Sequence, residues 1–159
     1  KADFSNITPM IVKMPSFESF YIRNKGYNIN IKETWQKLQT WILTNNIHSY
    51  KQIALFHDNP TITPLNDCQY IGCIVVDDLE KVESDRLPNF KIAEGVYAKF
   101  DLKGKTGDVL PFIHWVYHEW LPKSEYETTT KPSYAIYKKL DFLDDSDEFD
   151  LSFYVSINF

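Results

Sequence analysis

Residues 20–42 read FYIRNKGYNINIKETWQKLQTWI, a strand-like run that closes at Gly26 and leads into a helix. Residues 98–120 read AKFDLKGKTGDVLPFIHWVYHEW and repeat this order, with Gly104 in place of Gly26. The two glycines lie 78 residues apart, about half the chain, and each precedes a helix that contains tryptophan. The sequence therefore predicts an internal duplication. In the first copy the helical period is carried by Ile31, Trp35, Leu38, Trp41 and Ile42.

The first copy spans about residues 9–78. Residues 10–23 alternate like a strand, and Pro15 within them indicates a break or an edge position. After the helix, residues 52–57 form a short predicted strand, and the nearly unbroken apolar run at 69–76 predicts a central buried strand.

The second copy spans about residues 89–159, after a charged stretch at 77–88 that is predicted to link the two. One strand is expected over 90–102 and a helix with Asp108 as its cap and Pro122 as its end. Two more strands, at 133–140 and 149–158, flank an acidic loop. A single strand-helix-strand-strand module cannot bury both its sheet face and its helix, so pairing two copies is the favoured solution.

The expected fold is therefore α+β. It consists of two tandem strand-helix-strand-strand modules with pseudo-twofold symmetry, antiparallel sheets and a ligand cleft between the modules. Residues 1–159 form a single domain, since this length fits one ordinary hydrophobic core.

Composition restricts the function. A net charge of −5 without a long basic run argues against direct nucleic-acid binding. No apolar run approaches the roughly 20 residues of a membrane span. Cys68 and Cys73 lie five residues apart in a predicted strand, where they face opposite ways. Unpaired cysteines favour a reducing, cytoplasmic location. The aromatic fraction of 16% favours both a rich core and a ligand site with aromatic walls.

Several motifs together resemble the GyrI-like effector-binding domain, a small-molecule-binding module found alone or at the C-terminus of AraC-type transcription regulators. HDNP followed by TP and CQYIGCI is similar in order and spacing to the family's HDxP, TP and CRYDAC elements, and EWLPKSEYE is similar to its EWLPxSGYE. The motifs cover nearly the whole chain and lie at 21–27, 57–60, 63–64, 68–74, 119–127 and 132–137.

The resemblance implies a ligand between the modules that is lipophilic and often cationic, held by aromatic walls and by a carboxylate. In this chain Ala135 stands where the family's FExY pattern places that Glu, and Ile71 replaces the Asp of its YDAC element. A buried carboxylate is costly and mainly selects for positive charge. Its loss predicts a preference for neutral or aromatic apolar ligands over cationic dyes.

We expect the ligand-binding residues at the inner ends of the strands and on the helix faces, with Tyr137 favoured because it shares a strand face with Ala135. Trp35 and Trp41 have core-like spacing and are assigned to packing. Periodicity alone does not separate a cleft wall from the core. The predicted ligand-binding residues are Tyr21, Tyr70, Trp115, Trp120, Tyr134 and Tyr137.

We assign no catalytic residue, metal or cofactor. Glu119 is the one substitute for the missing carboxylate, and its place before WLP favours a structural role. His114 and His118 have a metal-compatible spacing but no third ligand nearby. The loop at 141–150 lacks the glycine of a calcium site. The adjacent His57 and Asp58 are predicted to form a turn, and Cys73 a buried packing residue.

The leading functional prediction is sensing of an apolar or aromatic small molecule, as the C-terminal part of an AraC-type regulator. DNA would be contacted only through a helix-turn-helix domain preceding Lys1, and no membrane partner is expected. The alternatives are a stand-alone protein-interaction module similar to gyrase inhibitors and, third, a hydrolase of reactive small molecules.

Overall fold

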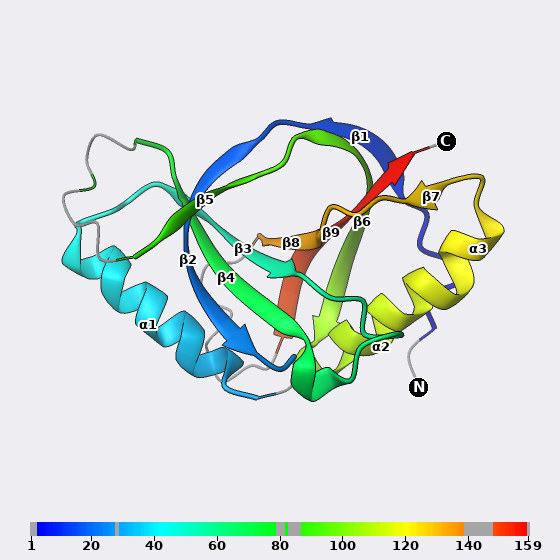
Figure 1. The fold of residues 1–159 in the computed structure, drawn as a ribbon, viewed down its shortest axis with the longest axis horizontal. Coiled ribbons are helices and arrows are strands. Elements are labelled where there is room, and N and C mark those ends of the chain that lie inside the picture. The colour runs from blue at the N-terminus through cyan, green and yellow to red at the C-terminus, as the bar shows by residue number, and fades with distance from the viewer. Residues whose placement is uncertain (1–2, 28, 79–81, 83–86, 139–147, 159) are drawn as a thin grey trace.

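The structure, a computed structural model, describes residues 3–27, 29–78, 82, 87–138 and 148–158. Both long helices lie on one side of a curled antiparallel sheet (Figure 1). The first half of the chain contains β1 (Met10–Met14), β2 (Phe17–Lys25), α1 (Ile31–Thr44), β3 (Tyr50–Phe56) and β4 (Gln69–Val76). The second half contains β5 (Asn89–Ile92), β6 (Gly95–Lys105), α2 (Val109–Trp115), α3 (Leu121–Lys123), β7 (Glu127–Thr128), β8 (Ser133–Tyr137) and β9 (Glu148–Asn158).

The strand order of the sheet is β1-β6-β9-β8-β3-β4-β2-β5, and β7 pairs with β9 outside this path. The two halves of the sheet have matching strand orders. Going inward, β6 is followed by β9 and then β8 in one half, and β2 is followed by β4 and then β3 in the other. In each half the outer of these three strands comes first in the chain, the next one comes last, and the innermost one comes between them. The two halves meet where β3 pairs with β8. The α+β class and the antiparallel sheets are thus confirmed.

Most predicted elements in the first half occur at the expected positions. Pro15 does divide the first strand into β1 and β2, and the apolar run at 69–76 is β4. The long predicted strand at 90–102 is wrong, because β5 and β6 are separate. β5 lies at one edge of the sheet and pairs with β2, whereas β6 lies near the other edge, between β1 and β9. The chain therefore crosses from one side of the sheet to the other around Ala93 and Glu94.

The second helix begins after the predicted cap residue, Asp108, and ends at Lys123, one residue beyond the predicted Pro122. Asp108 precedes α2, but its side chain makes no capping bond to it; instead its Oδ2 accepts a hydrogen bond from the Lys105 backbone N–H at 3.3 Å. Beyond Trp115 the helix continues as a π-helical turn, Val116–Trp120, and then as α3, which contains Pro122. Pro122 lies in the first turn of α3, where its missing N–H is tolerated, and the helix ends at Lys123.

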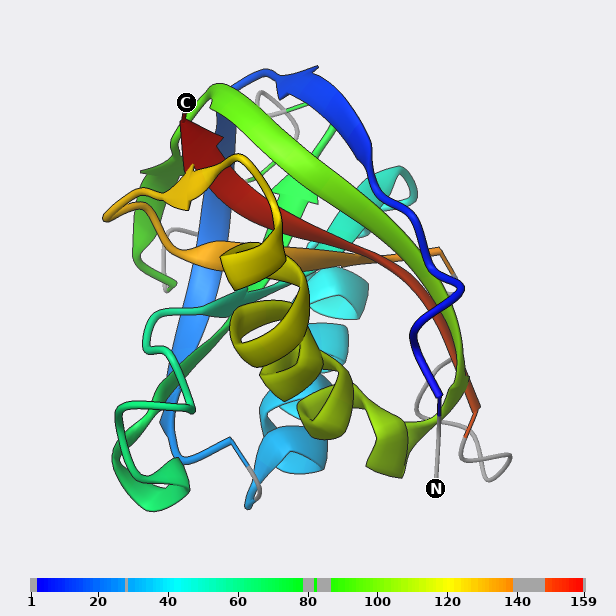
Figure 2. The same cartoon turned by 90° about the vertical axis from the view of Figure 1, so that its right-hand side faces the viewer.

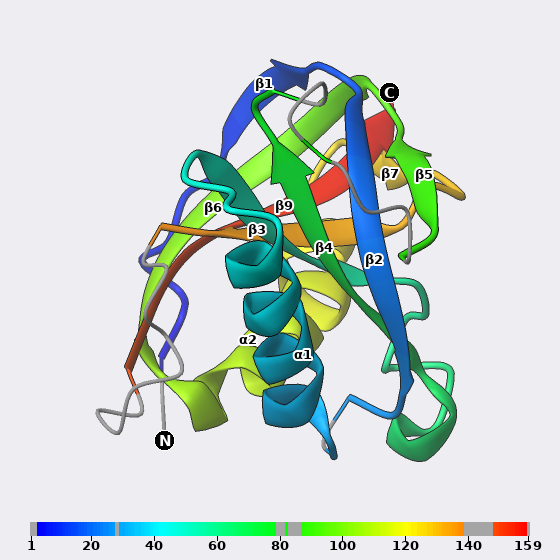
Figure 3. The same ribbon diagram turned by 90° about the vertical axis from the view of Figure 1, so that its left-hand side faces the viewer.

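The curled sheet separates two hydrophobic cores. The helix-side core lies between the sheet and the helices, and holds Trp35 and Leu38 of α1 and Phe112 and Ile113 of α2. Figure 3 shows α1 lying along β2 and β4, with α2 behind it. We call the core on the opposite face the inner core; it includes Ile53, Leu55, Ile71, Cys73, Ile92, Tyr97, Tyr134 and Tyr154.

The outer strands close around the inner core. β1 and β6 run together above the helices and curve with β9 past α2 (Figure 2).

The described residues contain no helix that is long and apolar enough to cross a membrane. Cys68 lies in the helix-side core and Cys73 in the inner core, so the two thiols face opposite ways, as predicted. The predicted linker at 77–88 and the acidic loop at 141–150 fall largely outside the described residues.

Candidate ligand-binding centre

A row of small side chains crosses the middle of the sheet on its helix side. In the register of β4, β3 and β8, Gly72 pairs with Ala54 and Ala54 pairs with Ala135. A Cβ at Gly72 would lie 2.8 Å from Leu38 Cδ1, so α1 approaches the sheet closely there. Ala54 and Ala135 are fully buried. We call Gly72, Ala54 and Ala135 the small-residue floor.

Two tyrosines meet above this floor from opposite sides. Tyr70 lies two residues before Gly72 on β4, opposite Phe56, and Tyr137 lies two residues after Ala135 on β8, opposite Gln52. Tyr70 therefore belongs to the row on one side of the floor and Tyr137 to the row on the other side. Their phenols are hydrogen-bonded to each other across it.

Trp35 of α1 completes the cover. Its Nε1 donates a hydrogen bond to the Tyr70 hydroxyl at 2.8 Å, and its ring meets the Tyr137 ring edge-on, with centroids 5.8 Å apart. Trp35 was predicted as a packing residue, and it is indeed fully buried in the helix-side core. Its bond to Tyr70 could not be read from helical spacing. We call Trp35, Tyr70 and Tyr137 the aromatic plug.

The plug is electrically neutral. Burial raises the pKa of Tyr70 well above its ordinary value and also raises the pKa of Tyr137. Both phenols therefore stay protonated at neutral pH and act as hydrogen-bonding groups. Neither offers a negative charge to a cation.

Among the six predicted ligand-binding residues, the structure brings Tyr70 and Tyr137 together and places two others on the opposite face. Tyr134 lies in the inner core, where its ring stacks on Tyr154 with centroids 4.9 Å apart. Tyr21 packs against the same core and meets Phe90 edge-on at 4.9 Å. The sheet separates both side chains from the plug.

Trp115 and Trp120 lie toward β6, at the edge of the helix-side core. Both rings contact Phe100 of β6, at centroid distances of 6.3 Å and 5.0 Å. Trp115 also contacts Phe4 at 6.1 Å. With Ser5, Glu119, Lys123 and Ser124, the two tryptophans line an open surface pocket of about 480 Å³. This pocket is a second place where a ligand could meet aromatic rings.

The two positions that lack a family carboxylate are not equivalent. Ala135 faces the plug, whereas Ile71 belongs to the inner core. Glu119, the one candidate to replace the carboxylate, lies on the outer surface, where its Oε2 is 3.1 Å from Lys123 Nζ. That ion pair agrees with the structural role predicted for Glu119. Because Glu119 is on the surface, its carboxylate does not reach the small-residue floor.

His114 and His118 stack face to face on the second helix, with ring centroids 5.9 Å apart. His114, His118 and Glu119 border a surface hollow of about 450 Å³ that also includes Phe4 and Trp115. Within the described residues, no group of three or more His, Cys, Asp and Glu side chains is arranged to hold a metal ion.

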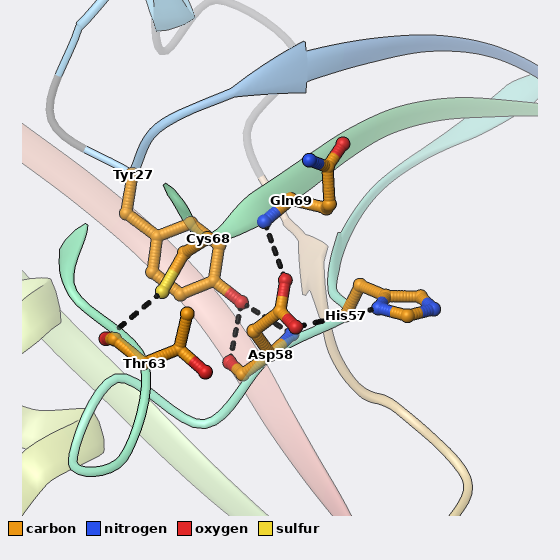
Figure 4. A network of polar contacts seen from close by, with 6 residues as sticks. All are labelled: Tyr27, His57, Asp58, Thr63, Cys68 and Gln69. Atoms are coloured by element: carbon orange, nitrogen blue, oxygen red, sulfur yellow. Dashed lines mark hydrogen bonds and ion pairs between the residues drawn. The ribbon is translucent and has the colours of Figure 1, made fainter. Parts of the chain in front are cut away.

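The His57-Asp58 pair follows directly after β3 and joins a network of polar contacts with Tyr27 and Gln69 (Figure 4). Asp58 Oδ2 accepts a hydrogen bond from the Gln69 backbone N–H at 2.6 Å, and His57 Nδ1 lies 3.7 Å from Asp58 Oδ1. Tyr27 donates its hydroxyl to the Asp58 carbonyl and accepts the Asp58 backbone N–H. Asp58 thus ties the loop to the start of β4, as expected for a structural turn.

A curled antiparallel sheet with two helices on one face places this chain in the α+β class of domains. Residues 7–157 match the model of the GyrI-like small molecule binding domain, and the chain belongs to this family.

Solved structures share the fold over nearly the whole chain. The EcmrR C-terminal domain superposes with a TM-score of 0.70 at 15% identity, covering 96% of this chain and 98% of that one. In the EcmrR–DNA complex the TM-score is 0.71 at 16% identity, with 96% of this chain matched, and the match spans only 57% of the EcmrR chain.

Two further structures extend the comparison. A hydrolase encoded by lin2189 from Listeria innocua gives a TM-score of 0.64 at 10% identity, covering 98% of this chain and 95% of that one. SAV2435 bound to tetraphenylphosphonium gives 0.59 at 9% identity, covering 94% and 93%. No curated protein matches the sequence significantly.

Proposed function

We propose that this chain is the sensing domain of a bacterial transcription regulator, of the AraC type that its motifs resemble, and that it binds a neutral aromatic molecule at its centre. In this proposal the ligand displaces the aromatic plug and lies on the small-residue floor between α1 and α2. The single observation that carries it is the meeting of Tyr70 and Tyr137 over Ala54 and Ala135. The side chains of Tyr70 and Tyr137 fill the space that the small residues of the floor leave empty on β3, β4 and β8.

A plug of this kind suits a binding site that opens. Trp35, Tyr70 and Tyr137 are held by hydrogen bonds between their tips, each worth about 0.5–1.5 kcal/mol net. A ligand that stacks on the same rings recovers aromatic contact as it breaks those bonds. Binding would then shift the population from closed to open and move α1, which carries Trp35.

The uncharged surroundings favour a neutral ligand. Ala135 supplies no carboxylate, and burial keeps the tyrosines protonated, so a cation entering here would lose hydration without gaining a counter-charge. Cation–π contact with the rings would return only about 0.5–2 kcal/mol. SAV2435 binds a cation on the same fold, and we propose that this chain differs in ligand charge.

Regulation of DNA would require a segment beyond this domain. EcmrR in its DNA complex is a longer chain than the part matched here. This supports a protein in which one segment binds the ligand and another contacts DNA. The hydrolase among the structural neighbours supports catalysis less well, because the plug and floor contain no acidic side chain to act as acid or base. A protein-interaction role, the other alternative, has no specific observation in its favour.

Calorimetric titration with benzophenone, diphenylmethane and tetraphenylphosphonium tests the proposal. Wild-type protein should bind the two neutral probes with micromolar affinity and the phosphonium at least about tenfold more weakly. Tyr137→Ala should weaken binding of the neutral probes about tenfold, because it removes one ring that stacks on the ligand.

Trp115→Ala is the matched control, since Trp115 lines the outer pocket instead. It should leave affinity for the neutral probes within about twofold. If Trp115→Ala abolishes binding and Tyr137→Ala does not, the site is the outer pocket. If wild-type protein binds none of the probes, the proposed function is wrong.

A further inference from the structure

Gln52 of β3 has a fully buried side chain whose amide Nε2 and Oε1 both lack a hydrogen-bond partner among the residues that the structure describes. A buried amide without partners is costly, and native proteins rarely tolerate one unless water or a ligand satisfies it. An aliphatic side chain of similar size would fill the same space without that cost. The unpaired amide therefore calls for a partner that the described part of the chain does not supply.

The register places Gln52 at the edge of the small-residue floor. Gln52 pairs with Tyr137 of β8 on one side and with Ile74 of β4 on the other, and Ala54 is its next neighbour on the same face of β3. Ile53 and Leu55 alternate with these residues and belong to the inner core. The Gln52 amide thus lies on the helix side, next to the strand partner that forms one end of the plug.

A second unpaired donor belongs to the same core. Trp41 Nε1 is buried and has no hydrogen-bond partner within the described ranges, and the Trp41 ring packs against Phe20 with centroids 4.9 Å apart. Phe20 pairs with Ile74, which in turn pairs with Gln52. The helix-side core therefore holds two unused donors and one unused acceptor on its α1 half, all uncharged.

We propose that Gln52 is the polar recognition group of the ligand centre, and that it selects neutral aromatic ligands bearing a carbonyl or amide over ligands that are purely hydrocarbon or cationic. The inference rests on the proposed function, because it assumes that a ligand enters at the plug. Gln52 Nε2 would donate to a ligand carbonyl, and Oε1 would accept an N–H where the ligand has one. A site with an unpaired amide discriminates strongly against ligands that leave it unpaired.

Two matched probes isolate this contact. Benzophenone and diphenylmethane have the same two rings and differ in the carbonyl. Wild-type protein should prefer benzophenone about tenfold, as expected for one hydrogen bond to an otherwise unpaired buried group. Gln52→Leu should remove the preference by weakening benzophenone about tenfold while leaving diphenylmethane within about twofold.

A charge variant tests the selectivity in the opposite direction. Gln52→Glu places a carboxylate of nearly the same shape at the floor, so tetraphenylphosphonium should gain at least about tenfold in affinity and benzophenone should lose its advantage. Thermal unfolding without ligand gives a separate readout. Gln52→Leu should raise the Tm by about 2–4 °C, since it removes the unpaired amide.

The outcomes separate the two proposals. If wild-type protein binds the neutral probes, and Gln52→Leu keeps the full preference for benzophenone, then Gln52 is not the recognition group and the proposed function stands. If wild-type protein binds no probe, the proposed function fails and the assignment of Gln52 fails with it. A Gln52→Leu Tm below that of wild type would show that the amide has a stabilising partner and would also overturn the assignment.

Discussion

The phenols of Tyr70 and Tyr137 are hydrogen-bonded to each other across the Ala54–Ala135 pair, although the two tyrosines lie in different rows of the sheet. The bond joins a strand from the first half of the chain to a strand from the second. It also depends on α1, because Trp35 Nε1 donates to the same Tyr70 oxygen at 2.8 Å. Opening the centre requires these contacts to break together, and four predictions about the centre and the buried thiols follow from the surrounding structure.

Tyr137→Phe should strengthen the binding of diphenylmethane by up to about fivefold. The variant keeps the aromatic ring and removes the hydroxyl that is hydrogen-bonded to Tyr70, a bond that stabilises the closed state by about 1 kcal/mol. Titration calorimetry measures the change. Tyr97→Phe is the control, because Tyr97 donates to the Ala93 carbonyl at 2.8 Å and belongs to the inner core. Weaker binding by Tyr137→Phe would contradict a plug that competes with the ligand.

Ala135→Glu should destabilise the protein in a pH-dependent way. Burial raises the folded-state pKa of the new carboxyl above its unfolded value of about 4.3, so the penalty is small below about pH 4. As the pH rises, the unfolded state releases its proton first, and a shift of about three units would cost about 4 kcal/mol at pH 7 and above.

Urea unfolding of Ala135→Glu between pH 4 and pH 8 checks this slope, with Ala135→Gln as the uncharged control of equal size. The Gln variant should lose stability from crowding alone, to the same extent at every pH. The Glu variant should also bind tetraphenylphosphonium more tightly than wild type does. Parallel pH profiles for the two variants would show that position 135 is open to water.

Gly72→Ala should lower the free energy of unfolding by about 1–3 kcal/mol, the usual cost of overpacking. The added methyl would lie 2.8 Å from Leu38 Cδ1 and 3.1 Å from Thr34 Cγ2, so α1 must move away from the floor. Gly107→Ala is the matched control, since nothing lies within 4 Å of its added Cβ. Equal stability of the two variants in urea would contradict the close approach of α1.

The two buried thiols predict a loss of stability in alkali. Burial raises the pKa of Cys73 to about 12 and that of Cys68 to about 11, against about 8.5 in an unfolded chain. The thiols stabilise the folded state fully below pH 8.5, and this contribution falls as the pH rises further because only the unfolded state ionises. Between pH 8 and pH 10, Cys73→Ala should lose about 2 kcal/mol less stability than wild type.

Thiol modification gives an independent check on the cysteines. At pH 8 both should react with a disulfide reagent only as fast as the protein opens, and both should react at once in urea. Cys68→Ala and Cys73→Ala identify which thiol reacts. Rapid modification of either residue in the folded protein would contradict its burial.

Local patterns in the sequence predicted much of the fold. The spacing of Trp35, Leu38 and Trp41 located α1, and the apolar run at 69–76 located β4, because both depend on neighbours within one element. The division between β5 and β6 was missed, since it depends on which distant strands each one pairs with. The π turn before Pro122 was missed for a similar reason: no residue type marks it.

The candidate site divides in the same way. Tyr137 and Ala135 were identified together because residues two apart share a strand face. Tyr21 and Tyr134 were grouped with them, yet they lie on the other face, because the curled sheet buries both of its faces and aromatic residues occupy both. Gln52 was overlooked, since a glutamine in a short strand gives no sign that its amide will be buried and unpaired.

By itself, the sequence determined the secondary structure of the main elements and the duplicated order of those elements. It also determined the resemblance of the motifs to the GyrI-like family and the absence of a carboxylate at Ala135. These depend on residue type and short-range periodicity. Only the tertiary structure decided that Tyr70 reaches Tyr137 over the small-residue floor, that Trp35 joins them, and that Gln52 lies beside them. Those relationships arise from the register of strands far apart in the chain, and register is set by the packing of the whole sheet.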